Sequence, residues 1–239
     1  MADRDQSASN CAYDNGVYLT NNPTWHEEDS LWKADNIIEL IRRNRLEPSS
    51  VAEVGCGAGG VLKGVSDALP SVSCTGFEIS SQAYEICRNK IAPRLSFEHA
   101  DLLSVDLSKP YDILLAVDVF EHVEDYIGFL RKIKLKGEYK IFHIPLDLSV
   151  QAVFRKSPIL YSREKYGHLH HFTKEIALST LEVAGYEVVD VGYTSGSIEL
   201  GGLPWRTNIL KFPRRLLYMI NPDLAVRLLG GFSLLVLAK

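Results

Sequence analysis

The chain has 239 residues, 46% of them apolar, and a formal net charge of −4. A chain of this length and composition can bury a substantial core as one large domain. Its weak negative charge and the lack of a long basic block argue against nucleic acid as a partner. The four cysteines, Cys11, Cys56, Cys74 and Cys87, form no C-x-x-C pair. This spacing indicates reduced thiols of a cytoplasmic protein rather than a disulfide framework or a zinc site.

The first 46 residues are predicted to form an arm and a helical lid. Residues 1–26 are polar, with the aromatic side chains of Tyr13, Tyr18 and Trp25 interspersed, and a helical apolar repeat follows over residues 27–46. The polar first ten residues predict no signal peptide, and no uncharged apolar run reaches the ~18 residues of a membrane span. We expect residues 13–46 of this arm and lid helix (1–46) to cover a site on the main domain, residues 47–239.

From residue 47 onwards, short apolar runs alternate with helical patterns, as in βαβ units. Strands are predicted at residues 51–54, 72–77, 95–98, 111–117, 140–144, 186–192 and 234–238, and helices at residues 61–69, 80–90, 125–134 and 174–184. This alternation predicts an α/β fold with a doubly wound, mostly parallel, seven-stranded sheet of Rossmann-like type. An insertion at residues 195–231 would form a cap between the last two strands.

Acids or glycines follow four of these predicted strands. A glycine-rich loop follows the first strand, and Glu78, Asp101 and Asp118 follow the next three. Because ligands of doubly wound sheets bind at the carboxyl ends of the strands, these groups predict a binding site on one rim.

The loop itself contains Gly55, Gly57 and Gly60 in the G-x-G-x-x-G spacing. That spacing alone is typical of nicotinamide and flavin binders as well as of other nucleotide sites. Glu53 stands two positions before the first glycine, where its charge would repel a pyrophosphate but favour a ligand with an ammonium group and a sulfonium centre. The loop therefore indicates S-adenosylmethionine rather than a dinucleotide.

With these positions in place, residues 45–239 resemble the class I S-adenosylmethionine-dependent methyltransferases. The matching stretches are VAEVGCGAGG, TGFEIS, HADLLSVDL and YDILLAVDVFEHVED, followed by HLHHFTKEIALSTLEVAGYEVV, which is similar to the late helix and strand of small-molecule members. The resemblance implies methyl transfer from S-adenosylmethionine to a small molecule, with an oxygen of a glycan or natural-product intermediate as the expected acceptor.

The resemblance also implies a cofactor-binding set, which comprises Glu53, Gly55, Cys56, Gly57, Glu78, Ile79, Asp101, Leu102 and Asp118. Within it, Glu78 would accept hydrogen bonds from the two ribose hydroxyls. Asp101 would meet the adenine amino group, and Leu102 would offer its backbone N–H to the ring. Gly55 and Gly57 would pass close to the methionine part.

Two further roles follow from the same resemblance. Glu53 would support the glycine loop, and Asp118 would border both the methionine part and the substrate pocket. Asp118, Glu121 and His122 are also similar to the Glu-x-x-Glu-His set of metal-assisted O-methyltransferases, with Asp in place of the first Glu. Members without metal carry the same Glu-His-Val, so the prediction is that no metal binds.

Histidines are the candidates for deprotonating a hydroxyl acceptor, because neutral imidazole titrates near the working pH. His143, His122 and His170 are the predicted catalytic residues. In an extended segment, alternation would place His168 and His170 on one side and His171 on the other.

Two other functions stay open at this point. A nicotinamide-dependent oxidoreductase would share the glycines and the strand-end acid. A non-catalytic binding module would use the Leu-rich tail, residues 201–239, which carries six basic residues and one acid. That tail would suit a dimer contact or a peripheral membrane contact; a monomer or homodimer without membrane contact is the expected state.

Overall fold

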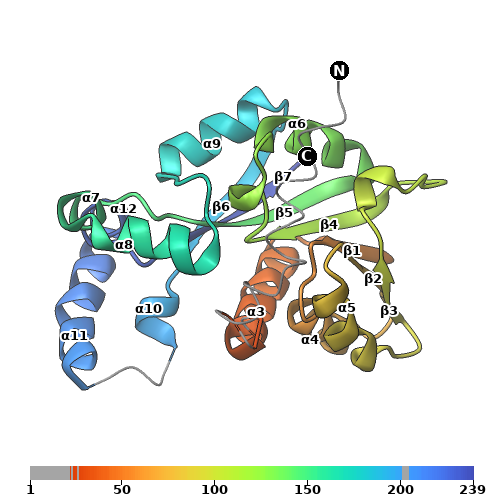
Figure 1. The fold of residues 1–239 in the computed structure, drawn as a ribbon, viewed down its shortest axis with the longest axis horizontal. Coiled ribbons are helices and arrows are strands. Elements are labelled where there is room, and N and C mark those ends of the chain that lie inside the picture. The colour runs from red at the N-terminus through yellow and green to blue at the C-terminus, as the bar shows by residue number, and fades with distance from the viewer. Residues whose placement is uncertain (1–21, 23, 26, 201–204) are drawn as a thin grey trace.

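A computed structural model describes Asn22, Thr24, Trp25 and residues 27–200 and 205–239 of the chain. It contains a seven-stranded sheet in the order β3-β2-β1-β4-β5-β7-β6 (Figure 1). The pairs between β1, β2, β3, β4 and β5 are parallel, whereas β7 runs antiparallel to both β5 and β6. The predicted α/β, doubly wound, mostly parallel sheet is therefore confirmed.

The strands follow the predicted segments closely. They are β1 (Ser50–Val54), β2 (Ser73–Glu78), β3 (Leu95–His99), β4 (Tyr111–Val117), β5 (Gly137–Pro145), β6 (Val188–Thr194) and β7 (Ser233–Ala238). One helix, α3 (Glu27–Arg43), precedes the first strand. The helices between strands include α4 (Gly60–Ala68), α5 (Ser81–Cys87), α6 (Tyr126–Ile133) and α9 (Lys174–Val183).

Helices cover both faces of the sheet, with α3, α4 and α5 on one side and α6 and α9 on the other (Figure 1). Side chains of β4 alternate between the two: Ile113 and Leu115 pack with residues of α3 and α4, and Leu114 and Ala116 pack with residues of α6 and α9. This burial on both faces is why β4 is an uninterrupted apolar run rather than an alternating one.

The helix α3, predicted as a lid, forms part of this core. Ala34, Ile37, Leu40 and Ile41 are at most 1% exposed and pack against the sheet beside α4. The prediction of a lid therefore stays a prediction for the first turn of α3 and the arm before it. Tyr13 and Tyr18 of the arm lie outside the described residues.

Further helices lie together at one end of the sheet, after β5 and between β6 and β7 (Figure 1). Those after β5 are α7 (Val150–Arg155), α8 (Ser157–Tyr161) and a π-helical turn at Ser162–Tyr166, and those before β7 are α10 (Gly196–Glu199), α11 (Trp205–Ile220) and α12 (Pro222–Leu229). The second group is the predicted cap insertion. The first group was not predicted, because helices of five or six residues are too short to show a repeat. None of the helices that the structure describes is long and apolar enough to cross a membrane.

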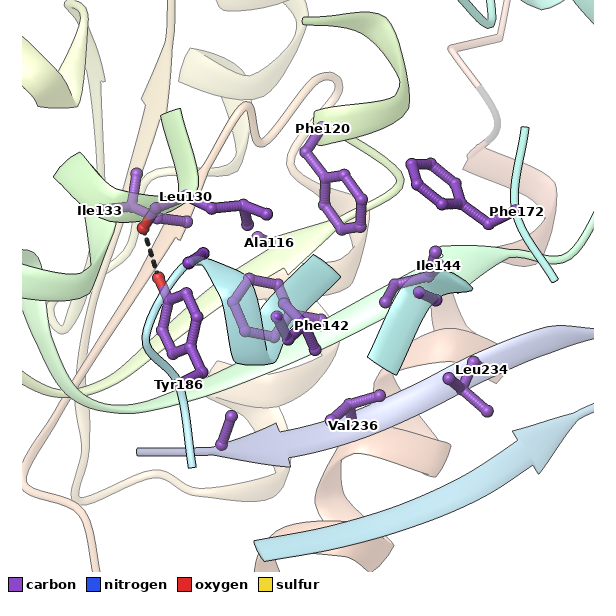
Figure 2. Close-up of a cluster of buried hydrophobic side chains, with 14 of the residues drawn as sticks. Ala116, Phe120, Leu130, Ile133, Phe142, Ile144, Phe172, Tyr186, Leu234 and Val236 are labelled. Atoms are coloured by element: carbon purple, nitrogen blue, oxygen red, sulfur yellow. Dashed lines mark hydrogen bonds between the residues drawn. The ribbon is translucent and has the colours of Figure 1, made fainter. Parts of the chain in front are cut away.

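Figure 2 shows the aromatic centre of the core on the α6 side, where Phe120, Phe142, Phe172 and Tyr186 pack together. Phe142 meets Tyr186 edge-to-face, with ring centroids 5.2 Å apart. The Tyr186 hydroxyl donates a hydrogen bond of 2.6 Å to the backbone carbonyl of Leu130 in α6. This hydrogen bond connects the loop between α9 and β6 to α6 on the same face of the sheet.

Replacing Tyr186 with phenylalanine is expected to lower the free energy of unfolding by about 1 kcal/mol, the usual net contribution of one such hydrogen bond. Urea unfolding followed by circular dichroism measures this. Tyr84→Phe is the control, because the Tyr84 hydroxyl has no hydrogen bond among the described residues, while the ring stacks on His99 and packs against the core on the α3 side. Equal effects of the two substitutions would contradict the assignment.

Candidate functional site

The glycine loop makes three tight bends between β1 and α4. Gly55, Gly57 and Gly59 have φ angles of 65°, 53° and 76°, which residues with a Cβ rarely adopt. The third such position is Gly59 and not Gly60, which is the first residue of α4. A Cβ on Gly59 would lie 2.7 Å from the Phe97 ring, so this glycine also permits close packing. The predicted G-x-G-x-x-G spacing thus identified the loop but not its third strained position.

Glu78, at the end of β2, holds this loop. Its Oε2 accepts a hydrogen bond of 2.8 Å from the Gly57 N–H, and its Oε1 accepts one of 2.7 Å from the Ser80 N–H. The side chain is only 5% exposed, and burial raises its pKa although the backbone N–H groups oppose this. A carboxylate has about four lone-pair sites, so two remain for further donors. The expected pair of ribose hydroxyls fits this capacity.

The neighbouring strand ends place the residues predicted to meet the adenine. Ile79 follows Glu78 and is 44% exposed, so its side chain offers an apolar surface at the rim. Asp101 follows β3, and its Oδ1 accepts a hydrogen bond of 2.9 Å from the Leu103 N–H. The Leu102 side chain is 1% exposed and belongs to the core. A contact of Leu102 with a ligand would therefore come from its backbone, and this contact stays a prediction.

Glu53 lies beneath the loop on β1 and is 2% exposed. Its Oε2 has no hydrogen-bond partner among the described residues. Burial raises the pKa of Glu53 to about 8; the positive charge of Lys33 opposes this rise and the carboxylate of Glu78 adds to it. Cys56 is also buried, at 7% exposure, so its contribution to the loop comes from its backbone, whose carbonyl accepts from the Gly59 N–H.

Asp118, at the end of β4, is the centre of a charged network. Its φ of 51° is strained for a residue with a side chain. Its Oδ2 lies 2.8 Å from Lys33 Nζ, and Lys33 also lies 2.9 Å from Asp29. Its Oδ1 lies 2.6 Å from His143 Nδ1. Burial alone would raise the pKa of Asp118, but His143 and Lys33 outweigh it and hold that pKa well below the ordinary range.

His143, one of the predicted catalytic residues, has both ring nitrogens in contact. Nδ1 faces Asp118, and Nε2 lies 2.9 Å from the hydroxyl of Thr194 at the end of β6. The residue is 3% exposed. In this geometry His143 orients Asp118, and its role as a proton acceptor for the substrate stays a prediction.

Two tryptophans lie next to these groups. Trp25 is the nearest side chain to Gly57, with ring Cε3 3.8 Å from the position of a Cβ on that glycine. Trp32 in α3 meets the His143 ring edge-on, with centroids 6.2 Å apart, and its Nε1 donates to Glu199 of the cap insertion. The start of α3 therefore connects the rim to the insertion.

The histidines near the rim do not follow the predicted alternation. The backbone N–H groups of Leu169 and His170 both donate to the carbonyl of Glu121, which bends the segment instead of extending it. His168 and His171 consequently face the same carboxylate, Asp147, at 2.6 and 3.1 Å. The placement of His168 and His170 on one side was predicted for an extended segment, and this segment is bent.

The other two predicted catalytic histidines lie on different sides of this bend. His170 Nε2 contacts the carbonyl of Val123 at 3.0 Å, and its ring packs on Tyr126. His122 Nδ1 lies 3.2 Å from the carbonyl of Gly167, and its ring meets the His168 ring edge-on at 5.0 Å. The structure thus brings His122, but not His170, into a cluster with His168.

Glu121 completes this cluster and is fully buried, at 0% exposure. Burial raises the pKa of its carboxyl well above the ordinary range, and Asp118 adds to that rise. Sequence reasoning linked Glu121 with Asp118 and His122, but the contact with His168 depends on a chain segment 47 residues away and could not be read from spacing.

Two shallow hollows lie elsewhere on the surface, one over α6 and α9 and one over α3 and the end of α4. Neither contains a predicted site residue.

Comparisons with known proteins identify the family of this chain. A family described as "Methyltransferase domain" matches residues 24–191. A search of curated proteins gives no match. Among solved structures, the magnesium protoporphyrin IX methyltransferase of Synechocystis with bound SAH is 13% identical, with a TM-score of 0.62 and coverage of 98% of this chain and 99% of that chain.

Two other solved structures have the same fold. The plantazolicin methyltransferase BpumL in complex with SAH is 19% identical, with a TM-score of 0.54 and coverage of 99% of this chain and 90% of that chain. A Nostoc punctiforme protein provisionally described as an O-methyltransferase is 16% identical, with a TM-score of 0.63. That match covers 94% of this chain but only 60% of the Nostoc protein. At these identities the likeness establishes the fold alone.

Proposed function

This chain belongs to the methyltransferase domain family, and we propose that it transfers the methyl group of S-adenosylmethionine to an oxygen atom of a small molecule. The cofactor is supported by the strand-end groups described above and by the SAH bound to similar structures. The oxidoreductase alternative lacks such support, because it leaves Glu53 and the acid at the end of β4 without a role.

The observation that carries the proposal is the pair formed by Glu78 and the glycine loop. A buried carboxylate at the end of β2 is held 2.8 Å from the loop N–H of Gly57, with lone pairs left for two more donors. Vicinal ribose hydroxyls supply two such donors at once. Ile79 and Asp101, which follow β2 and β3, are the residues that we propose to meet the base of that nucleoside.

In the proposed transfer, S-adenosylmethionine would supply the methyl group and be released as S-adenosylhomocysteine, and one of the predicted catalytic histidines would take the proton of the acceptor hydroxyl. The protein then contributes mainly alignment of the two reactants, which can supply about 7–11 kcal/mol of the barrier reduction. Asp118 is held by Lys33 and His143 at the rim, and we propose that it borders the methionine part of the cofactor and the substrate pocket. The acceptor class, glycan or natural-product intermediate, follows from analogy with small-molecule members of the family.

Calorimetric titration with S-adenosylhomocysteine tests the cofactor. We expect the wild-type protein to bind it in the micromolar range and Glu78→Ala to weaken binding by about 1–3 kcal/mol, because the ribose hydroxyls lose a buried acceptor. Glu98→Ala is the matched control, since Glu98 lies on the adjacent strand and is exposed. Unchanged affinity in Glu78→Ala, or binding of reduced nicotinamide cofactor instead, would refute the assignment.

The predictions about membrane contact, cellular location and oligomeric state stay predictions. Phe154 of α7 and Phe212 and Met219 of α11 are 88%, 76% and 73% exposed, and basic Arg214 and Arg215 lie between the last two. These exposed side chains are the candidates for a peripheral membrane or dimer contact. Cytoplasmic location and the monomeric or homodimeric state are expected on the grounds given with the sequence.

A further inference from the structure

The most unusual side chain in the chain is Glu121, in the 3-10 turn Phe120–His122 after β4. It is 0% exposed, and neither carboxyl oxygen has a hydrogen-bond partner among the described residues. Buried carboxyl groups are nearly always hydrogen-bonded, paired with a cation or coordinated to a metal. Glu121 therefore points to a ligand that the described residues do not supply.

Two histidines are oriented toward this carboxylate by contacts on their other nitrogens. The Nδ1 of His122 lies 3.2 Å from the carbonyl oxygen of Gly167, which can only accept, so Nδ1 carries the hydrogen and the lone pair is on Nε2. His122 Nε2 lies 4.0 Å from Glu121 Oε1. His168 Nδ1 faces the carboxylate of Asp147 at 2.6 Å, so its lone pair is on Nε2 as well.

Ligand atoms of Glu121, His122 and His168 all lie within 4.8 Å of one another. A metal–nitrogen or metal–oxygen bond of about 2.0–2.2 Å brings ligands of a tetrahedral site to a mutual spacing somewhat below that value. Behind them, Asp147 holds His168 and also contacts His171 at 3.1 Å. A carboxylate that fixes the far nitrogen of a histidine is the usual support of a metal-binding imidazole.

We propose that Glu121, His122 and His168 bind one divalent transition-metal ion, with Asp147 as the positioning residue for His168. Two imidazoles and one carboxylate suit Zn²⁺, Fe²⁺, Co²⁺ or Mn²⁺, whereas Mg²⁺ and Ca²⁺ favour sites built from oxygen ligands. This inference departs from the metal-free site predicted from the sequence. It also differs from the Asp-x-x-Glu-His set considered there, because Asp118 is bound to Lys33 and His143.

Three protein ligands leave coordination positions open, as in catalytic rather than structural sites. The cluster follows β4 and Asp118 in the chain, so the ion would be available to an oxygen of the acceptor in the proposed transfer. The acceptor class that fits is a hydroxyl or phenol that binds a metal ion. This use of the ion rests on the proposed methyl transfer, whereas binding of the ion does not.

Metal titration of the full chain tests the site. After chelator treatment, we expect the protein to bind one Co²⁺ per chain with a visible absorption band, and Zn²⁺ to displace it. Glu121→Gln and His168→Gln should each weaken Co²⁺ binding by at least about 10-fold, and Asp147→Asn by about 10-fold or more, as seen when supports of metal ligands are removed. His170→Gln should bind like wild type, because His170 faces Val123 and Tyr126.

Calorimetry with S-adenosylhomocysteine on each variant separates this proposal from the proposed function. Variants that keep cofactor binding but lose Co²⁺ support the metal site. Absence of Co²⁺ and Zn²⁺ binding by the wild-type protein overturns it, as does unchanged Co²⁺ affinity in Glu121→Gln or an equal loss in His170→Gln. Should Glu121→Gln fail to fold, His168→Gln and Asp147→Asn decide the matter. A wild-type protein that binds metal but no cofactor would refute the methyl transfer and leave the metal site standing.

Discussion

Replacing Lys33 by methionine is expected to lower the free energy of unfolding by about 3 kcal/mol, the lower end of the cost of breaking a buried ion pair. Lys33 is the cation between Asp29 and Asp118, at 2.9 and 2.8 Å, and its side chain is 10% exposed. Methionine preserves most of the buried aliphatic length, so the loss reports the charge. Asp118 keeps His143 as a partner, which is why the lower end of the range applies.

Urea unfolding at neutral pH measures this loss. Lys63→Met is the matched control, because Lys63 forms an exposed i, i+4 pair with Asp67 on α4 and such pairs contribute only about 0.3–0.5 kcal/mol. Adding Asp118→Asn to Lys33→Met should recover part of the lost stability, since it removes the uncompensated charge. Equal destabilisation by Lys33→Met and Lys63→Met would contradict the role assigned to Lys33.

The rim of the sheet was predictable because its parts are local in sequence. Each strand is a short apolar run that ends in a glycine or an acid, and parallel strands bring those ends to one edge without any further information. Gly55, Gly57, Glu78 and Asp118 accordingly lie where the pattern placed them. Gly59 was missed because a fixed motif spacing selected Gly60, while the actual constraint is the ring of Phe97 packed against the loop.

The charged network and the histidine cluster were not predictable, since both depend on contacts distant in sequence. Lys33 looks like a solvent-facing residue of an amphipathic helix until α3 packs on the sheet and brings it to Asp118. His168 reaches Glu121 only because the chain bends where two consecutive N–H groups donate to the Glu121 carbonyl. A rule of alternating sides has no means of detecting such a bend.

Protonation of Glu53 makes the free energy of unfolding depend on pH. Burial raises its pKa to about 8 in the folded protein, whereas an unfolded glutamate has a pKa near 4.3. Between these values the folded protein retains a proton that the unfolded chain releases. The free energy of unfolding therefore falls as pH rises through this window, and the contribution of Glu53 is lost completely above the folded-state pKa.

Glu53→Gln should remove this dependence, because the amide does not titrate. We expect the stability of the variant, relative to wild type, to increase by on the order of 2–4 kcal/mol between pH 5 and pH 8.5, somewhat less than the full shift of the Glu53 pKa would give. Urea unfolding of both proteins at a series of pH values measures the change. The comparison is between slopes, so a constant cost of burying the amide does not affect it.

Glu98→Gln, which alters an exposed carboxylate on β3, should follow the wild-type curve at every pH. A difference between Glu53→Gln and wild type that stays constant with pH would mean that Glu53 is already ionised in the folded protein, held in that form by the positive charge of Lys33.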